Sequence, residues 1–127
     1  MNYRVQRSDR AEADLEKAFL HFARRSPESA GVWLEGLVRT IEALPDFPGP
    51  KSHPFAFEND RFDVEVRRLL YHGNSKRQRG GNVYRVLFHV IEPEEGETEG
   101  VVRVLRVLHA AQALEPADLS EQEEDEP

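Results

Sequence analysis

Two short segments near the C-terminal end of the chain, 82–91 and 101–109, are the richest in β-branched and aromatic residues and predict two strands. Side chains alternate between the two faces of a strand, so the first segment has one apolar and one mixed face. The apolar face consists of Tyr84, Val86, Phe88 and Val90, and the mixed face of Arg85, Leu87, His89 and Ile91. Residues 93–100 between the segments predict a hairpin loop. We expect the apolar face to cover the core and the mixed face to carry the function.

The N-terminal part of the chain predicts a strand followed by a helix. Residues 2–7 alternate between polar and apolar side chains, as in a strand with one buried face. From residue 10 the apolar positions recur every three or four residues, as they do along an amphipathic helix. Ser8 or Asp9 can cap this helix, since either side chain can accept a free backbone N–H in the first turn. We expect the helix to end near residues 24–25.

A second helix and three further segments follow. Ser26 and Pro27 predict the start of the helix, whose apolar positions continue to Leu44. Because the two helices are joined so briefly, we expect them to pack as an antiparallel pair. Residues 45–59 are rich in proline and predict an irregular connector, residues 64–71 predict a strand, and residues 72–82 predict a loop rich in glycine and arginine.

The order of elements is therefore strand, helix, helix, strand, strand, strand, which indicates the α+β class. We expect one domain at residues 1–114, with a mostly antiparallel sheet packed on the helical pair. Residues 110–114 are its predicted last ordered piece. Residues 115–127 contain seven acidic residues and no basic one, and we expect this tail to be disordered.

Composition narrows the functional class. The chain has 127 residues, no cysteine, and a formal net charge of −7. Setting aside the seven acidic residues of the tail leaves 17 acidic residues against 17 basic ones, so the body is neutral. Within it, residues 67–90 contain six basic residues and no acidic one, which favours an anionic partner. No apolar run is long enough to cross a membrane, and the N-terminus lacks the apolar core of a signal peptide, so we expect a cytoplasmic protein.

The whole pattern resembles the toxins of the RelE/ParE superfamily of type II toxin–antitoxin, or plasmid stabilisation, systems. The resemblance covers about residues 3–112. It rests on Ala13-Asp-Leu-Glu16, Ala30-Gly-Val-Trp-Leu-Glu-Gly-Leu37, Ala43-Leu-Pro-Asp-Phe-Pro48, Val83-Tyr-Arg-Val-Leu-Phe88 and Val104-Leu-Arg-Val-Leu-His-Ala-Ala111. It implies a β-α-α-β-β-β fold whose sheet packs on the helical pair, and an antitoxin that holds the toxin inactive.

Two mechanisms occur in this superfamily. A RelE-like resemblance implies a ribosome-dependent endonuclease that cuts messenger RNA. A ParE-like resemblance implies a protein that binds DNA gyrase and poisons it. RNA cleavage requires a cation for the phosphate and a group that transfers protons. Arg85 matches the arginine of the family's Tyr-Arg-Val strand and is the candidate phosphate clamp, and His109 is the candidate acid–base residue. The alternatives are an Arg85 paired with a carboxylate and a His109 without a catalytic role.

A further set of residues could bind RNA, gyrase-bound DNA or the antitoxin through charge or stacking. It consists of Arg67, Arg68, Lys76, Arg77, Arg79 and Tyr71. Only one of the two adjacent arginines can share the face of Arg85. The histidine spacing predicts no metal site, and nothing in the sequence indicates a cofactor. The leading hypothesis is a messenger RNA endonuclease with Arg85 in a solvent-facing hollow opposite the helices. The rivals are a non-catalytic gyrase inhibitor and a degenerate member that binds only its antitoxin.

Overall fold

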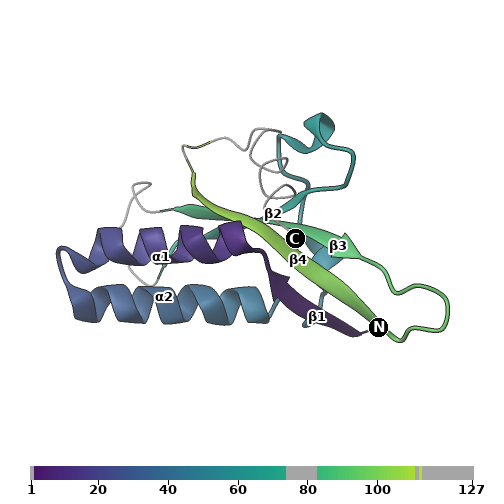
Figure 1. Ribbon diagram of the computed structural model, residues 1–127, viewed down its shortest axis with the longest axis horizontal. Coiled ribbons are helices and arrows are strands. Elements are labelled where there is room, and N and C mark those ends of the chain that lie inside the picture. The colour runs from purple at the N-terminus through teal and green to yellow at the C-terminus, as the bar shows by residue number, and fades with distance from the viewer. Residues whose placement is uncertain (1, 74–82, 111, 113–127) are drawn as a thin grey trace.

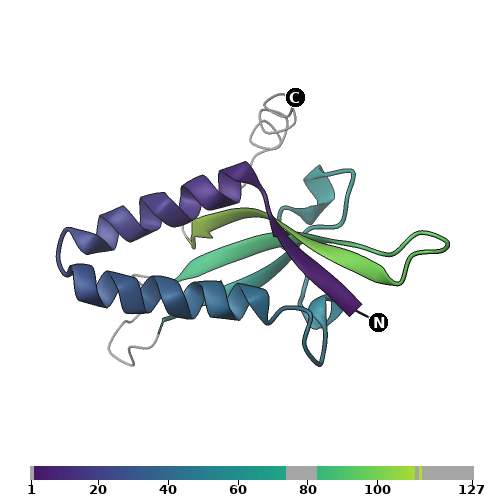
Figure 2. The ribbon, with the colours of Figure 1, turned by 60° about the horizontal axis from the view of Figure 1, so that its bottom comes forward.

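The computed structural model describes residues 2–73, 83–110 and 112, and within them a four-stranded sheet packs on a pair of helices (Figures 1 and 2). The elements in chain order are β1 (Asn2–Arg7), α1 (Asp9–Ala23), α2 (Pro27–Glu42), β2 (Arg67–Tyr71), β3 (Tyr84–Ile91) and β4 (Glu99–His109). The strand order is β1-β4-β3-β2, with β1 parallel to β4 and the other neighbours antiparallel. The predicted α+β class and element order are confirmed.

The helices begin where the sequence predicts. The Ser8 hydroxyl caps α1 by accepting the backbone N–H of Ala11 at 3.1 Å. Ser26 caps α2 in the same way, with Pro27 in its first turn. Both helices end slightly before their predicted ends, α1 at Ala23 and α2 at Glu42.

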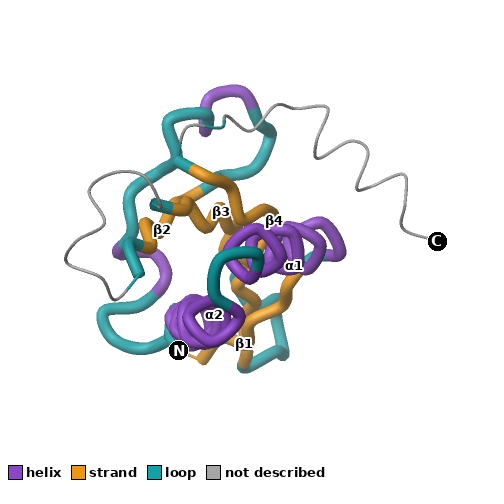
Figure 3. Tube along the Cα trace, turned by 90° about the vertical axis from the view of Figure 1, so that its left-hand side faces the viewer, coloured by secondary structure: helices purple, strands orange, loops and turns teal. Residues whose placement is uncertain are grey.

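The main core lies between the helical pair and one face of the sheet. Figure 3 shows the two helices end-on, with the strands beside them. The core face of the sheet carries the four residues predicted to be apolar on β3, and α2 contributes Trp33, Leu37 and Ile41. The Tyr71 hydroxyl donates to the backbone oxygen of Trp33 at 3.0 Å. This close approach requires Gly36, because a Cβ there would collide with the Tyr71 hydroxyl. The predicted division of β3 into two faces is therefore confirmed.

The other face of the sheet is covered, in contrast to the expectation of a hollow. The connector between α2 and β2 rises above the sheet on the side away from the helices (Figure 1). There, a second buried cluster joins connector residues to β3 and β4, and it comprises Ala56, Val66, Leu87, Leu105 and Leu108, with Phe62 packed against them. The connector contains two short 3-10 turns, Pro50–Ser52 and Asn59–Arg61.

The connector also pairs with the outer edge of β2. Phe55 forms an antiparallel bridge with Arg67, and the Ala56 N–H donates to the Val66 oxygen at 2.8 Å. The strand begins at Arg67 rather than at the predicted Val64, because its pairing with β3 begins at Arg67. An edge paired in this way presents fewer free backbone groups to other chains.

Candidate functional site

Arg85 is buried in an ion pair. Its Nη1 donates to Oε1 of Glu58 at 2.8 Å and its Nη2 to Oε2 at 2.6 Å, while Nη2 also reaches the backbone oxygen of Gln112 at 2.8 Å. The Phe57 ring covers the guanidinium, with its centroid 4.6 Å from Cζ. Only 3% of Arg85 is exposed. The expectation that Arg85 stands in a solvent-facing hollow is therefore wrong.

The prediction is wrong about the exposure of Arg85 but right about the direction of its side chain. Arg85 does point away from the helices, as the alternation along β3 predicts. The connector brings Glu58 over this face, and a carboxylate matches the two parallel N–H groups of a guanidinium. Both charges are removed from water, so separating them would leave an unpaired buried charge. The structure therefore shows the alternative given above, in which Arg85 pairs with a carboxylate instead of a phosphate.

Arg67 and Arg68 hold different positions on β2. Arg67 donates to the backbone oxygen of His53 at 2.7 Å and lies over the Phe55 ring, 4.3 Å from its centroid. Leu69 and Tyr71, which lie on the same face of β2 as Arg67, pack in the main core. Arg68 lies on the opposite face of β2, which is the face that Arg85 shares. Arg67 therefore anchors the connector to the edge of the sheet.

His53 is a residue of the connector whose pKa depends on the packing of the connector against the sheet. Its ring packs edge-on against Phe88, with centroids 5.7 Å apart. Burial lowers the pKa of His53, and the nearby Arg67 guanidinium lowers this pKa further. The unfolded chain therefore takes up this proton at a higher pH than the folded chain does.

We expect the free energy of unfolding to fall as the pH is lowered from about 7 to about 5, because protonation of His53 favours the unfolded state in this window. Substitution His53→Gln removes this contribution and flattens the pH profile. Urea unfolding at a series of pH values measures the effect, and His72→Gln, at an exposed position, is the matched control. An equal profile in the His53→Gln and wild-type chains would contradict the expectation.

Tyr71 and the basic loop complete the predicted binding residues. Tyr71 is buried, and this burial raises the pKa of its hydroxyl. It packs edge-on against Trp33 in the core, so the prediction that Tyr71 offers a stacking surface to a target is wrong. Lys76, Arg77 and Arg79 lie outside the described residues, and their role stays a prediction.

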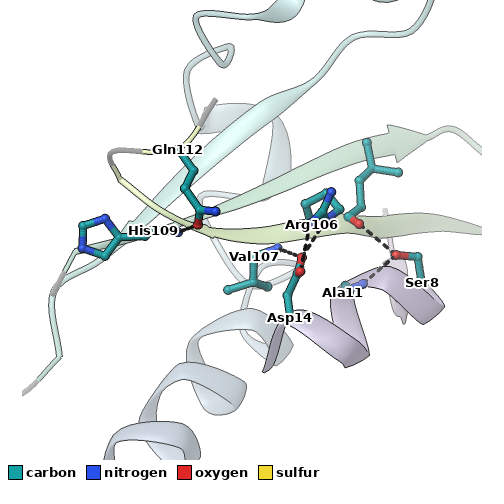
Figure 4. A network of polar contacts seen from close by, with 8 residues as sticks. Ser8, Ala11, Asp14, Arg106, Val107, His109 and Gln112 are labelled. Atoms are coloured by element: carbon teal, nitrogen blue, oxygen red, sulfur yellow. Dashed lines mark hydrogen bonds and ion pairs between the residues drawn. The ribbon is translucent and has the colours of Figure 1, made fainter. Parts of the chain in front are cut away.

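Beyond the end of β1, side chains of Ser8 and α1 form hydrogen bonds with backbone groups on the edge of β4 (Figure 4). β1 pairs with β4 only as far as Val104. Beyond it, the Ser8 hydroxyl donates to the Leu105 oxygen at 2.9 Å, and Oδ2 of Asp14 accepts the Val107 N–H at 2.9 Å. The same carboxylate accepts Nε and Nη2 of Arg106 at 2.7 and 3.0 Å. Asp14 thus connects α1 to the last strand.

His109 lies beside this network at the end of β4. Its imidazole projects away from the Asp14–Arg106 pair in Figure 4 and packs edge-on against Tyr84, with centroids 5.5 Å apart. The two line a cleft of about 270 Å³ between α1 and β4, together with Asp14, Lys17, His21 and Arg106. Lys17 and His21 were not among the predicted site residues, although their spacing of four places them on one face of a helix.

The structure places Arg85 and His109 on opposite faces of the sheet. Residues directly opposite each other on neighbouring strands share a face. His109 is opposite Tyr84, on the side of the helices, whereas Arg85 is opposite Leu108, on the side of the connector. The two predicted catalytic residues are therefore not brought together in one site.

Comparison with known proteins identifies the family. Within the described residues, no helix is both long and apolar enough to span a membrane. No curated protein matches the chain. The family model described as the ParE toxin of the type II toxin–antitoxin system parDE matches residues 5–114. This match covers most of the chain and agrees with the β-α-α-β-β-β order of the fold. The chain belongs to the ParE toxin family of type II toxin–antitoxin systems, within the RelE/ParE superfamily.

Proposed function

We propose that this ParE-family toxin inhibits growth by binding DNA gyrase without catalysing a reaction, and that a cognate antitoxin holds it inactive. The observation that carries the proposal is the separation of Arg85 and His109. A nuclease must present a phosphate-binding cation and a proton-transfer group to the same phosphodiester. Here the guanidinium is covered by the connector on one face, and the imidazole lies on the other.

The pairing of Arg85 supports the same conclusion. A guanidinium that already forms two charge-assisted hydrogen bonds with Glu58 has little left for a phosphate. Freeing it would break a buried ion pair, which costs several kcal/mol. Arg85 is better suited to hold the connector on the sheet than to bind RNA.

The second candidate function is ribosome-dependent cleavage of messenger RNA. One observation favours it: His109 lies in a cleft that also contains His21 and Lys17, side chains able to transfer a proton or hold an anion. In this alternative His109 keeps its predicted catalytic role, and Lys17 replaces Arg85 as the cation nearest the phosphate.

Inducing the toxin without an antitoxin tests both candidates in the same cells. We expect DNA breaks trapped on gyrase to increase while the 5′ ends of messenger RNA stay unchanged. With purified components, the toxin is expected to inhibit supercoiling by gyrase. Codon-phased RNA ends without gyrase-trapped breaks would overturn the proposal and favour the nuclease.

A further inference from the structure

We propose that the cleft between α1 and the end of β4 binds a phosphate group of a nucleic acid backbone. This goes beyond the gyrase proposal, which requires only a protein target, and it needs no catalysis of the kind that the nuclease alternative requires. The cleft is lined by side chains from both elements, Lys17 and His21 from α1 and Arg106 and His109 from β4. Tyr84 of β3 forms part of its wall.

Among the described residues that line the cleft, the one carboxylate, that of Asp14, is already paired with Arg106. Asp14 accepts two hydrogen bonds from Arg106 and one from the Val107 backbone. Its side chain and that of Arg106 are each 13% exposed, so their charges offset each other within the wall. Among these described residues, the exposed Lys17 then supplies the net positive charge.

The arrangement of the donors favours a tetrahedral anion. Lys17 and His21 line the cleft from consecutive turns of α1, and His109 lines it from the end of β4. Donors on different sides can each reach a different oxygen of a phosphate, whereas the two oxygens of a carboxylate lie in one plane. A phosphodiester also extends beyond the group that is bound, which suits a cleft that opens to solvent.

Binding of a short fluorescein-labelled DNA duplex to the full chain, made by cell-free synthesis, tests the inference without gyrase or antitoxin. We expect Lys17→Ala to weaken binding by about threefold to tenfold at low salt and to reduce the slope of log affinity against log salt by about one. The matched control is Arg39→Ala, which removes one positive charge from an exposed position on α2 outside the cleft. Circular dichroism confirms that each variant is folded.

Competition experiments identify the source of the phosphate. Displacement of the duplex by an unlabelled duplex, with the Lys17 dependence retained, supports a nucleic acid site. Saturable displacement by inorganic phosphate that also requires Lys17 shows that the cleft binds phosphate, with the free ion as the ligand. Equal losses in Lys17→Ala and Arg39→Ala would overturn the inference, as would displacement by a polyglutamate peptide at the same charge concentration. The gyrase proposal would stand in either case, because supercoiling inhibition is measured separately.

Discussion

Substitution Glu58→Ala is expected to lower the free energy of unfolding by about 3–5 kcal/mol, because it leaves the Arg85 guanidinium buried without its counter-charge. The Glu58 side chain is 0% exposed and that of Arg85 is 4% exposed, so water cannot replace the lost partner without opening the connector. Urea unfolding followed by circular dichroism measures the loss.

The exposed pair on α2 provides the control for this result. Arg39 and Glu35 are four residues apart, with Nη2 and Oε1 at 3.0 Å and both side chains largely in water. Glu35→Ala is expected to change the free energy of unfolding by less than about 0.5 kcal/mol. Equal effects of Glu58→Ala and Glu35→Ala would show that the buried pair does not hold the connector.

Replacing both partners separates the structural role of Arg85 from a catalytic one. The double variant Glu58→Leu, Arg85→Met removes both charges but retains side-chain volume, and apolar replacements of this kind are often neutral or stabilising. We expect the double variant to be more stable than either single variant and to inhibit growth as the wild-type chain does. A folded double variant that no longer inhibits growth would contradict this and restore Arg85 as a functional residue.

Substitution Asp14→Ala is expected to lower the free energy of unfolding by about 2–3 kcal/mol, because the change removes three hydrogen bonds at once. Two of them neutralise Arg106, and the third satisfies the Val107 N–H on the edge of β4 where β1 no longer pairs with it. Chemical unfolding measures the total effect, and hydrogen exchange at the Val107 amide measures the local one.

Two further variants show which part of the Asp14 contact matters. Asp14→Asn retains one acceptor for the Val107 N–H but loses the charge, so we expect slow exchange at this amide together with an intermediate stability. Glu16→Ala removes an exposed carboxylate from the same helix and is the control. Rapid exchange at Val107 in the control, or none in Asp14→Ala, would refute the assignment.

Local patterns predict the fold well because each of them depends on near neighbours. The Ser8 and Ser26 caps, the Pro27 start of α2 and the alternation along β3 depend on residues a few positions apart, and each appears in the structure as expected. The parallel pairing of β1 with β4 could not be derived in this way, since its partners are far apart in the chain.

The candidate site was harder to predict because its key contact joins distant residues. Arg85 and Glu58 are 27 positions apart, and the proline content of the connector indicated an irregular segment without indicating where it would pack. The apolar residues Ala56, Phe62 and Val66 were the available signal, because all three pack in the second cluster. A mixed strand face beside such a segment indicates a second core rather than a surface.

The position of β1 has a consequence for how the toxin is made. Asn2 is opposite Glu99 and Arg7 is opposite Val104, so β1 pairs with β4, the strand farthest from it in sequence among the strands that the structure describes. Contacts between residues so far apart carry a large loop-closure entropy and form slowly. The sheet cannot be completed until β4 has left the ribosome. A cell thus has the interval between the synthesis of β1 and the pairing of β1 with β4 in which to supply an inhibitor before the folded toxin exists.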